Sequence, residues 1–296
     1  MVYFWYRMAG IQDLEIRYMK IRLVADSSAN LFSLDDMDFR AVPLRIQAGE
    51  REYADTEGLD VPGMLKELKA HKGKSGTACP GVEDWISAFG DADVVYGVAI
   101  TSSLSGCWNA ASIAAREYMK ERPGAKVFIL DSLSTGPEME LILEKYAELI
   151  RQGRNFEEIC GAICSYAKNT RLLFSLESLA NFARNGRVNP AVAAAVGLLG
   201  IRIVGRASDE GTLEPMHKCR GEQKALAKLF SEMKKNGFRG GKVRLSHSYH
   251  AAAAEKLAEM IRAEFPECDL RIRINRGLCC YYAEEGGLLV GFEGEM

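Results

Sequence analysis

The chain has 296 residues, of which 48% are hydrophobic and 26% charged, a composition typical of a globular protein large enough for two domains. Its 38 basic and 40 acidic residues give a formal net charge of -2, and no run of Lys and Arg supplies a surface for nucleic acid. No apolar run reaches the roughly 18 residues that a membrane-spanning helix needs, which argues against such a helix.

The first 18 residues begin with aromatic side chains but contain no charged leader followed by a long apolar segment. We expect residues 1–18 to be an N-terminal extension, with Met19 as the natural start before a first strand. The cysteines form no C-x-x-C pair and show no paired zinc-binding spacing. Without a leader, reduced thiols and a cytoplasmic location are the expectation.

The first half of the chain alternates strand and helix patterns. The predicted strands are Ile21–Ala25, Ala41–Gln47, Val94–Ile100 and Lys126–Leu130. The predicted helices are Val61–His71, Trp85–Phe89, Ala110–Lys120, Met139–Arg151 and Phe156–Ala167. Because strands separated by helices favour right-handed crossovers, this half predicts a parallel sheet covered by helices on both faces.

The second half has a different pattern. The predicted strands are Leu172–Phe174, Arg202–Val204, Lys242–Ser246, Leu270–Ile274 and Leu288–Phe292. The predicted helices are Leu176–Asn185, Pro190–Leu199, Lys224–Lys235 and Ala251–Phe265, and Asp209–Gly211 predicts a turn. We expect a mixed or antiparallel sheet in an α+β domain over residues 169–296, after an α/β domain over residues 19–168.

Two segments carry side chains suited to a ligand, Ser75–Pro80 and Thr101–Gly106. The second follows a predicted strand and opens a helix. Ligands of open α/β sheets bind at the carboxyl ends of strands, and a helix N-terminus offers free N–H groups to an anion. The alternative interpretation is that Ser105 and its neighbours only cap the helix.

Two other common kinds of site, a phosphate-binding loop and a metal site, find little support in the sequence. The Gly-Lys-Ser at residues 73–75 lacks the earlier glycine of a phosphate-binding loop, since position 68 is Leu68. His247 and His250 are three residues apart, but no third metal ligand with matching spacing accompanies them.

In chain order, a series of short motifs resembles the DegV family over nearly the whole length from Met19. The matching motifs are Ala25-Asp26-Ser27-Ser28, Val42-Pro43-Leu44, Gly49, Tyr53-Ala54-Asp55, Thr77-x-x-Pro80, Ser102-Ser103-Leu104-Ser105-Gly106, Leu130-Asp131-Ser132, Asn185-Gly186-Arg187-Val188 and Lys218-Cys219-Arg220-Gly221. Each motif by itself is weak evidence for the family, whereas all of them in the expected order and at sensible spacing are strong evidence. The resemblance implies a Rossmann-like N-terminal domain and a second α+β domain that together bury a fatty acid.

The resemblance also implies roles for individual residues. The hydroxyls of Thr77 and Ser105 would hold the fatty-acid carboxylate, and Arg187 would lie near the head group. The other expected ligand-binding residues are Ser103, Gly106, Asp26, Ser27 and Tyr282. Arg220 matches an arginine involved in using the complex with a partner.

The implied ligand is a long-chain fatty acid such as palmitate, stearate or oleate, with no cofactor and no metal. The implied partner is a separate fatty acid kinase, which makes an acyl-phosphate for phospholipid synthesis. On this interpretation the chain supplies the substrate rather than a catalytic nucleophile, and it contacts the membrane only transiently.

The sequence departs from the family at two places. Cys107 stands where a threonine is usual. Near the C-terminus, Tyr282 takes the place of a histidine that helps to hold the carboxylate, and Glu284 and Glu285 replace part of a Gly-Pro-Gly turn. A phenol still donates a hydrogen bond, but the two carboxylates would repel a fatty-acid head group if they faced the pocket.

The cysteines support alternative functions. A thiol-dependent enzyme acting on a small acyl or anionic substrate would use Cys79 or Cys107, both in the candidate segments. Such a thiol needs a neighbouring base or cation, and no histidine is near either cysteine in sequence. A redox or metal site is a third class, at Cys279 and Cys280 or at Cys160 and Cys164.

Overall fold

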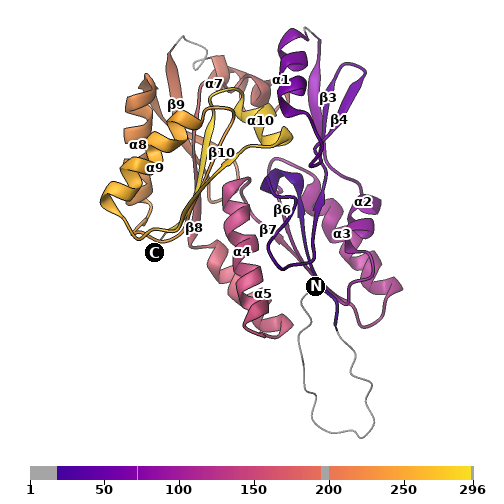
Figure 1. The fold of residues 1–296 in the computed structure, drawn as a ribbon. Coiled ribbons are helices and arrows are strands. Elements are labelled where there is room, and N and C mark those ends of the chain that lie inside the picture. Colours follow the sequence, from indigo (N-terminus) through magenta and orange to yellow (C-terminus); the bar gives the residue numbers. More distant parts are fainter. Residues whose placement is uncertain (1–18, 72, 195–199, 295–296) are drawn as a thin grey trace, which may run out of the picture.

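The computed structural model describes residues 19–71, 73–194 and 200–294, which form three β-sheets surrounded by helices (Figure 1). The predicted N-terminal extension, and residues 195–199 of the predicted helix Pro190–Leu199, lie outside this part of the chain. Within the described ranges, no helix is long and apolar enough to cross a membrane.

The first sheet is parallel throughout, as predicted. Its strand order is β2-β1-β6-β7, with bounds Phe39–Val42, Ile21–Asp26, Val94–Ala99 and Lys126–Asp131. The helices α2 (Val82–Phe89) and α3 (Cys107–Glu121) cover one face, and α4 (Pro137–Arg151) and α5 (Phe156–Ala167) cover the other (Figure 1). Burial on both faces explains why β6 is apolar without alternation.

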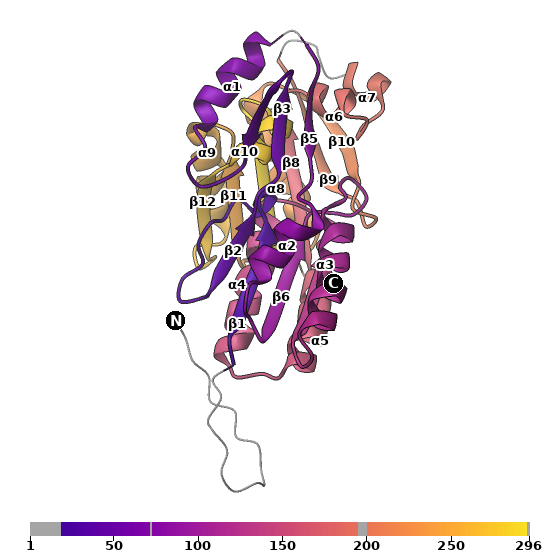
Figure 2. The same cartoon turned by 90° about the vertical axis from the view of Figure 1, so that its right-hand side faces the viewer.

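A small antiparallel sheet, not predicted, consists of β3 (Arg45–Ala48), β4 (Arg51–Ala54) and β5 (Ser75–Ala78). The helix α1 (Val61–Ala70) precedes β5, and Figure 2 shows this sheet and α1 beyond the end of the parallel sheet. The prediction of one strand over Ala41–Gln47 was wrong. Pro43 and Leu44 separate β2 from β3, because proline has no N–H to continue a ladder, and the chain passes from one sheet to the other.

The third sheet is mixed, as predicted, with the order β10-β9-β8-β13-β11-β12. In that order its strands are Leu213–Arg220, Ile201–Ala207, Thr170–Leu176, Leu288–Glu293, Val243–His247 and Leu270–Ile274. The helices around this sheet are α6 (Ala180–Arg184), α7 (Pro190–Ala194), α8 (Glu222–Lys235), α9 (Ala251–Glu264) and α10 (Gly277–Ala283). Strand β10 and helix α10 were not predicted.

Helix α4 joins the two halves, because it contacts both the parallel sheet and the mixed sheet. Gly291 on β13 lies directly against the start of α4: a Cβ there would be 2.5 Å from the Pro137 carbonyl carbon. The chain changes from one sheet to the other between β7 and β8. The domain boundary between residues 168 and 169 falls at this place and stays a prediction.

Candidate functional site

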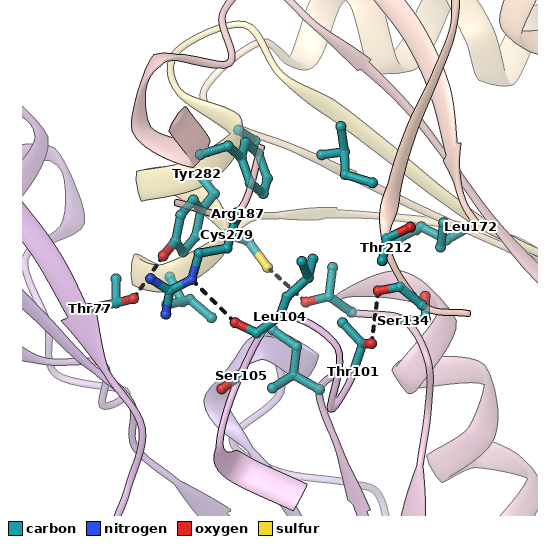
Figure 3. A pocket seen from close by; sticks show the side chains of 18 of the residues that line it. Thr77, Thr101, Leu104, Ser105, Ser134, Leu172, Arg187, Thr212, Cys279 and Tyr282 are labelled. Atoms are coloured by element: carbon teal, nitrogen blue, oxygen red, sulfur yellow. Dashed lines mark hydrogen bonds between the residues drawn. The ribbon is translucent and has the colours of Figure 1, made fainter. Parts of the chain in front are cut away.

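A cavity of about 320 Å³ lies where the three sheets approach one another, and this volume is within the usual range of small-molecule sites. Its walls come from β5, the loops after β6 and β7, strand β8, the β9–β10 turn, α6 and α10 (Figure 3). The cavity therefore depends on segments from both halves of the chain.

Strand β8 supplies an apolar wall. Successive side chains of a strand point to opposite faces. Leu172, Phe174 and Leu176 line the cavity, whereas Leu173 between them belongs to the core beneath α8 and α9. All of these leucines are buried. The alternation gives the cavity a continuous apolar surface along the strand.

Polar groups gather on one side of the cavity, where Figure 3 shows Thr77, Tyr282 and Arg187 close together. The Thr77 Oγ1 and Tyr282 OH atoms are 2.8 Å apart and share a hydrogen bond. Of the described residues that line the cavity, Arg187 is the one with a charged side chain. This side of the cavity is suited to an anionic group, since it combines hydroxyl donors with a cation.

Tyr282 is held in place by Phe182, which packs on its ring, and by Asp55, which fixes the start of its helix, α10. Its ring lies against Phe182 of α6, with ring centroids 4.7 Å apart. Burial raises the pKa of the Tyr282 phenol above its usual value, so the group stays neutral and can donate a hydrogen bond at neutral pH. Asp55 fixes the start of α10, since its carboxylate accepts from the Gly277 and Leu278 N–H groups at 2.8 and 3.0 Å.

Arg187 bridges the two halves of the site. Gly186 has a φ of 70°, a left-handed conformation that favours glycine, and it turns the chain after α6 so that Arg187 faces the cavity. The Arg187 Nε donates to the Leu104 carbonyl at 3.2 Å, and Nη1 donates to the Asn185 carbonyl at 2.5 Å. These bonds fix the guanidinium against the loop that follows β6.

Ser105 lies one residue before Gly106, the N-cap of α3, and lines the cavity, so its contact with the start of the helix and the ligand interpretation are compatible. Its Oγ accepts from the Cys107 N–H at 3.3 Å and donates to the Cys107 Sγ at 3.2 Å. Gly106 also lines the cavity and lies close to Cys79, because a Cβ on Gly106 would be 3.1 Å from the Cys79 sulfur. The first turn of α3 thus meets the end of β5 at the polar side of the cavity.

A family model described as "Uncharacterised protein, DegV family" matches residues 20–293. The chain belongs to the DegV family. A DegV domain-containing protein of Streptococcus pneumoniae is 39% identical over 279 residues, which cover 93% of this chain and 99% of that protein.

Solved structures of DegV proteins resemble this chain over nearly its whole length. One, a DegV family protein from Eubacterium eligens loaded with heptadecanoic acid, is 46% identical, covers 93% of this chain and 100% of its own, and has a TM-score of 0.91. Another, the Streptococcus pneumoniae Fatty Acid Kinase B3 protein loaded with linoleic acid, is 38% identical, covers 94% and 100%, and has a TM-score of 0.92.

The structure brings together five of the residues that were expected to bind the ligand. The cavity lining includes Thr77, Ser105, Gly106, Arg187 and Tyr282. Thr77 was expected in a loop but lies on β5, which holds its side chain more firmly than a loop would.

Ser103 and Arg220 lie elsewhere. Ser103 is exposed, and its Oγ donates to the Glu210 carbonyl at 2.5 Å, so it joins the loop after β6 to the β9–β10 turn. Arg220 is exposed at the end of β10 opposite that turn. It is six residues along the sheet from Ala207 in the cavity lining, or about 20 Å.

Asp26 and Ser27 are fully buried outside the cavity lining, where they shape the loops that form it. Asp26 accepts from the Ile100 N–H at 2.7 Å and from the Ser28 N–H at 3.0 Å. The Ser27 Oγ accepts from the Leu44 N–H at 3.1 Å. Their positions favour a positioning role for these motif residues, and direct contact with a ligand stays a prediction.

Asp26 gives a pH-dependent prediction. Burial raises the pKa of its carboxyl to about 6, from 3.8, so the folded state binds this proton more tightly than the unfolded state. The free energy of unfolding that Asp26 contributes should therefore fall by about 3 kcal/mol as pH rises from about 4 to 7, and then stay level. Urea unfolding of the natural protein and an Asp26→Asn variant across this range measures the difference, and a difference that does not change with pH would contradict it.

The two carboxylates that replace the family's turn do not face the cavity. The Glu284 Oε1 accepts from the Ser178 Oγ at 2.8 Å, and Glu285 is exposed with Lys69 at 3.7 Å. Glu284 has a φ of 54°, which its bonds to α6 hold in place. Neither carboxylate therefore points at an anionic ligand in the cavity, so the repulsion that the sequence alone left open does not arise there.

The thiols offer little support for catalysis. Burial raises the pKa of Cys107 well above its usual value, with Asp26 adding to the effect, so its thiol stays protonated. Cys79 lines the cavity, but no histidine or carboxylate is among the described lining residues to act as its base. Burial likewise raises the pKa of Cys280 to about 12 and of Cys160 to about 11.

Metal ligands are not clustered in the part of the chain that the structure describes: no group of three His, Cys, Asp or Glu residues there could hold an ion.

Sequence reasoning missed much of the apolar wall. Phe174 and Leu176 could have been found from the period-2 pattern of β8, because alternate residues of a half-covered strand share a face. Phe182 and Leu278 come from short helices whose position depends on the tertiary fold, and no local pattern indicates that they line a cavity.

Proposed function

We propose that this chain binds one long-chain fatty acid, with the carboxylate at the polar side of the cavity and the acyl chain along β8. The observation that carries the proposal is the asymmetry of the cavity. Hydroxyls and a guanidinium meet on one side, and Leu172, Phe174 and Leu176 form an apolar wall that leads away from it. The two solved DegV relatives, each loaded with a fatty acid, support it.

Most of the affinity would come from the acyl chain. Burying about fourteen methylene groups at about 0.8 kcal/mol each gives on the order of 10 kcal/mol before the costs of ordering. A carboxylate taken out of water is costly unless donors meet it, so the head group contributes orientation more than affinity.

Thr77, Ser105 and Arg187 are the proposed carboxylate ligands. The Thr77 and Tyr282 hydroxyls are already paired, so one of them can donate outward while it accepts from the other. Ser105 adds a hydroxyl beside the first turn of α3, whose dipole favours a negative charge, and its proton can turn from the Cys107 Sγ, a weak acceptor, to the carboxylate. Gly106 leaves space for close approach of a ligand to this turn.

Two further hydroxyls of the lining, those of Thr101 and Thr212, are occupied by other parts of the chain. The Thr101 Oγ1 donates to the Gly211 carbonyl at 2.8 Å, and the Thr212 Oγ1 is 2.8 Å from the Ser208 Oγ. These two hydroxyls bind the β9–β10 turn and are therefore not free to hold a head group.

We further propose that the chain presents its fatty acid to a separate kinase and performs no chemistry itself. The absence of a general base among the described lining residues supports this, as does the relative that is named as the B3 protein of a fatty acid kinase. Exposed Arg220, at the opposite end of β10 from the cavity, is the proposed partner contact. Domains 19–168 and 169–296 would then bury the acyl chain between them.

Native mass spectrometry of the purified protein, with identification of the released ligand, tests the proposal. We expect a mass increment of one fatty acid. A Thr77→Val, Ser105→Ala variant should bind about 100-fold more weakly, since a hydrogen bond to a charged group is worth about 1.5–3 kcal/mol and each lost bond costs roughly tenfold.

Ser102→Ala is the matched control, because Ser102 is exposed in the same loop and outside the cavity lining. Its affinity should equal that of the natural protein. A natural protein that carries no acyl lipid and takes up none when it is added would overturn the proposal.

A further inference from the structure

A second cavity of about 480 Å³ adjoins the first. It is formed by the end of β7 and the loop after it, the end of α5, the start of β8 and the turn after β9. None of the residues proposed to hold the carboxylate lines it.

Three residues line both cavities: Leu133, Leu172 and Ala207. Leu172 is 5% exposed and is the first residue of the apolar row on β8. Ala207 ends β9, and Leu133 lies in the loop after β7. Because each side chain borders both spaces, the three form a partition between them, which we call the shared wall.

Leu133 is held in the shared wall at a conformational cost. Its φ is 51°, a left-handed value that is unfavourable for a leucine, and it is 39% exposed. Its N–H donates to the Asp131 Oδ1 at 3.1 Å, and the Ser134 N–H donates to the Ser132 Oγ at 3.1 Å. These side-chain bonds to the backbone fix the loop, so an apolar side chain is presented at the junction of the two cavities.

The two cavities differ in chemistry. The lining of the second includes Lys168 and Arg171 as cations and Asp131 and Asp209 as anions. Glu138, also in its lining, is buried and accepts from the Thr170 Oγ1 at 2.7 Å. A methyl terminus that entered this space would displace the hydration of charged groups, which is unfavourable.

The shared wall lies at the far end of the acyl path. On β8, Leu176 lies next to α6, the helix that leads to Arg187. Leu172 is four residues earlier, about 13 Å along an extended strand. Figure 3 accordingly shows Leu172 on the opposite side of the cavity from Thr77 and Tyr282.

We infer that Leu133, Leu172 and Ala207 stop the methyl end of the acyl chain and thereby set the longest fatty acid that this protein accepts. The inference rests on the proposed fatty-acid binding, with the carboxylate at the Thr77 side. An acid that fits up to the wall keeps every methylene inside the first cavity, away from the charged side chains of the second. A longer one must displace the wall or bend back within the cavity.

A binding series tests the shared wall. Saturated fatty acids of increasing even carbon number compete for the full-length protein, and native mass spectrometry measures the bound fraction of each. Leu172→Ala shortens the wall and leaves space at the end of the first cavity, so we expect the preferred length to increase by about two carbons. The affinity ratio of the longer to the originally preferred acid should rise about tenfold, the value of two extra buried methylenes.

Two further variants separate the possible results. Leu176→Ala removes the same side chain from the same row, away from the wall, and should weaken binding of all lengths alike. Ala207→Leu thickens the wall and should shift the preference to shorter acids, which tests the inference even if Leu172→Ala does not fold.

The outcomes distinguish the two proposals. If the natural protein takes up no acid of any length, the proposed function itself fails. If it binds fatty acids, but Ala207→Leu and a folded Leu172→Ala keep its length preference, the shared wall has no role in selection, and the carrier function stands.

Discussion

An Arg244→Met variant should unfold with a free energy about 3–5 kcal/mol lower than the natural protein, since removing one partner of a buried ion pair leaves the other charge uncompensated. Arg244 on β11 is 1% exposed. Its Nε donates to the Glu144 Oε1 at 2.8 Å, and Nη2 donates to the Asp269 Oδ2 at 2.8 Å. Urea unfolding measures the effect.

The same pair has a structural consequence, because Glu144 belongs to α4 and Arg244 to the mixed sheet. Arg244 thus anchors α4, the helix that contacts both halves of the chain, to the mixed sheet. Arg271→Met is the matched control: Arg271 also contacts Glu144, at 3.1 Å, but its side chain is 51% exposed. An exposed pair contributes about 1 kcal/mol at most, so equal effects of the two substitutions would refute the prediction.

An Arg187→Met variant should bind a long-chain fatty acid about 30-fold more weakly, a loss of about 2 kcal/mol, the low end for truncating one partner of a desolvated charge pair. Methionine keeps an apolar stem of similar length but cannot pair with a carboxylate. Displacement of a fluorescent fatty acid measures the affinity.

The methyl ester of the same acid shows whether Arg187 acts through charge. The ester has no anionic head group, so Arg187→Met should bind it as well as the natural protein does. Arg184→Met is the control for the helix, since Arg184 is exposed on α6 and outside the cavity lining. An equal loss of affinity for acid and ester would show that Arg187 only supports the loop through Leu104.

The sequence determined much of the fold because its signals are local. The apolar runs of β1, β6 and β7 and the helical periodicity of α3, α4 and α5 follow from burial of neighbouring residues. The polar segment after β6 could also be assigned to a ligand, since the ends of parallel strands meet at one edge of a sheet. The resemblance then selected Thr77, Ser105 and Arg187, which the structure places around one cavity.

Other features depend on contacts between residues far apart in the chain. The division of Ala41–Gln47 between two sheets requires that β3 pair with β5, and α10 depends on Asp55, which is more than two hundred residues earlier. No local periodicity encodes such pairings.

The positions of Glu284 and Glu285 likewise could not be predicted from local sequence. The sequence placed both near the cavity, but whether a carboxylate faces a ligand depends on which partner it finds. The tertiary structure provides Ser178 for Glu284 and Lys69 for Glu285, both away from the lining. The sequence by itself thus determined most of the elements, and the resemblance to the family supplied the head-group residues. Only the tertiary structure decided the shape of the cavity and its end at Leu133, Leu172 and Ala207, because that wall joins three segments that lie far apart in the chain.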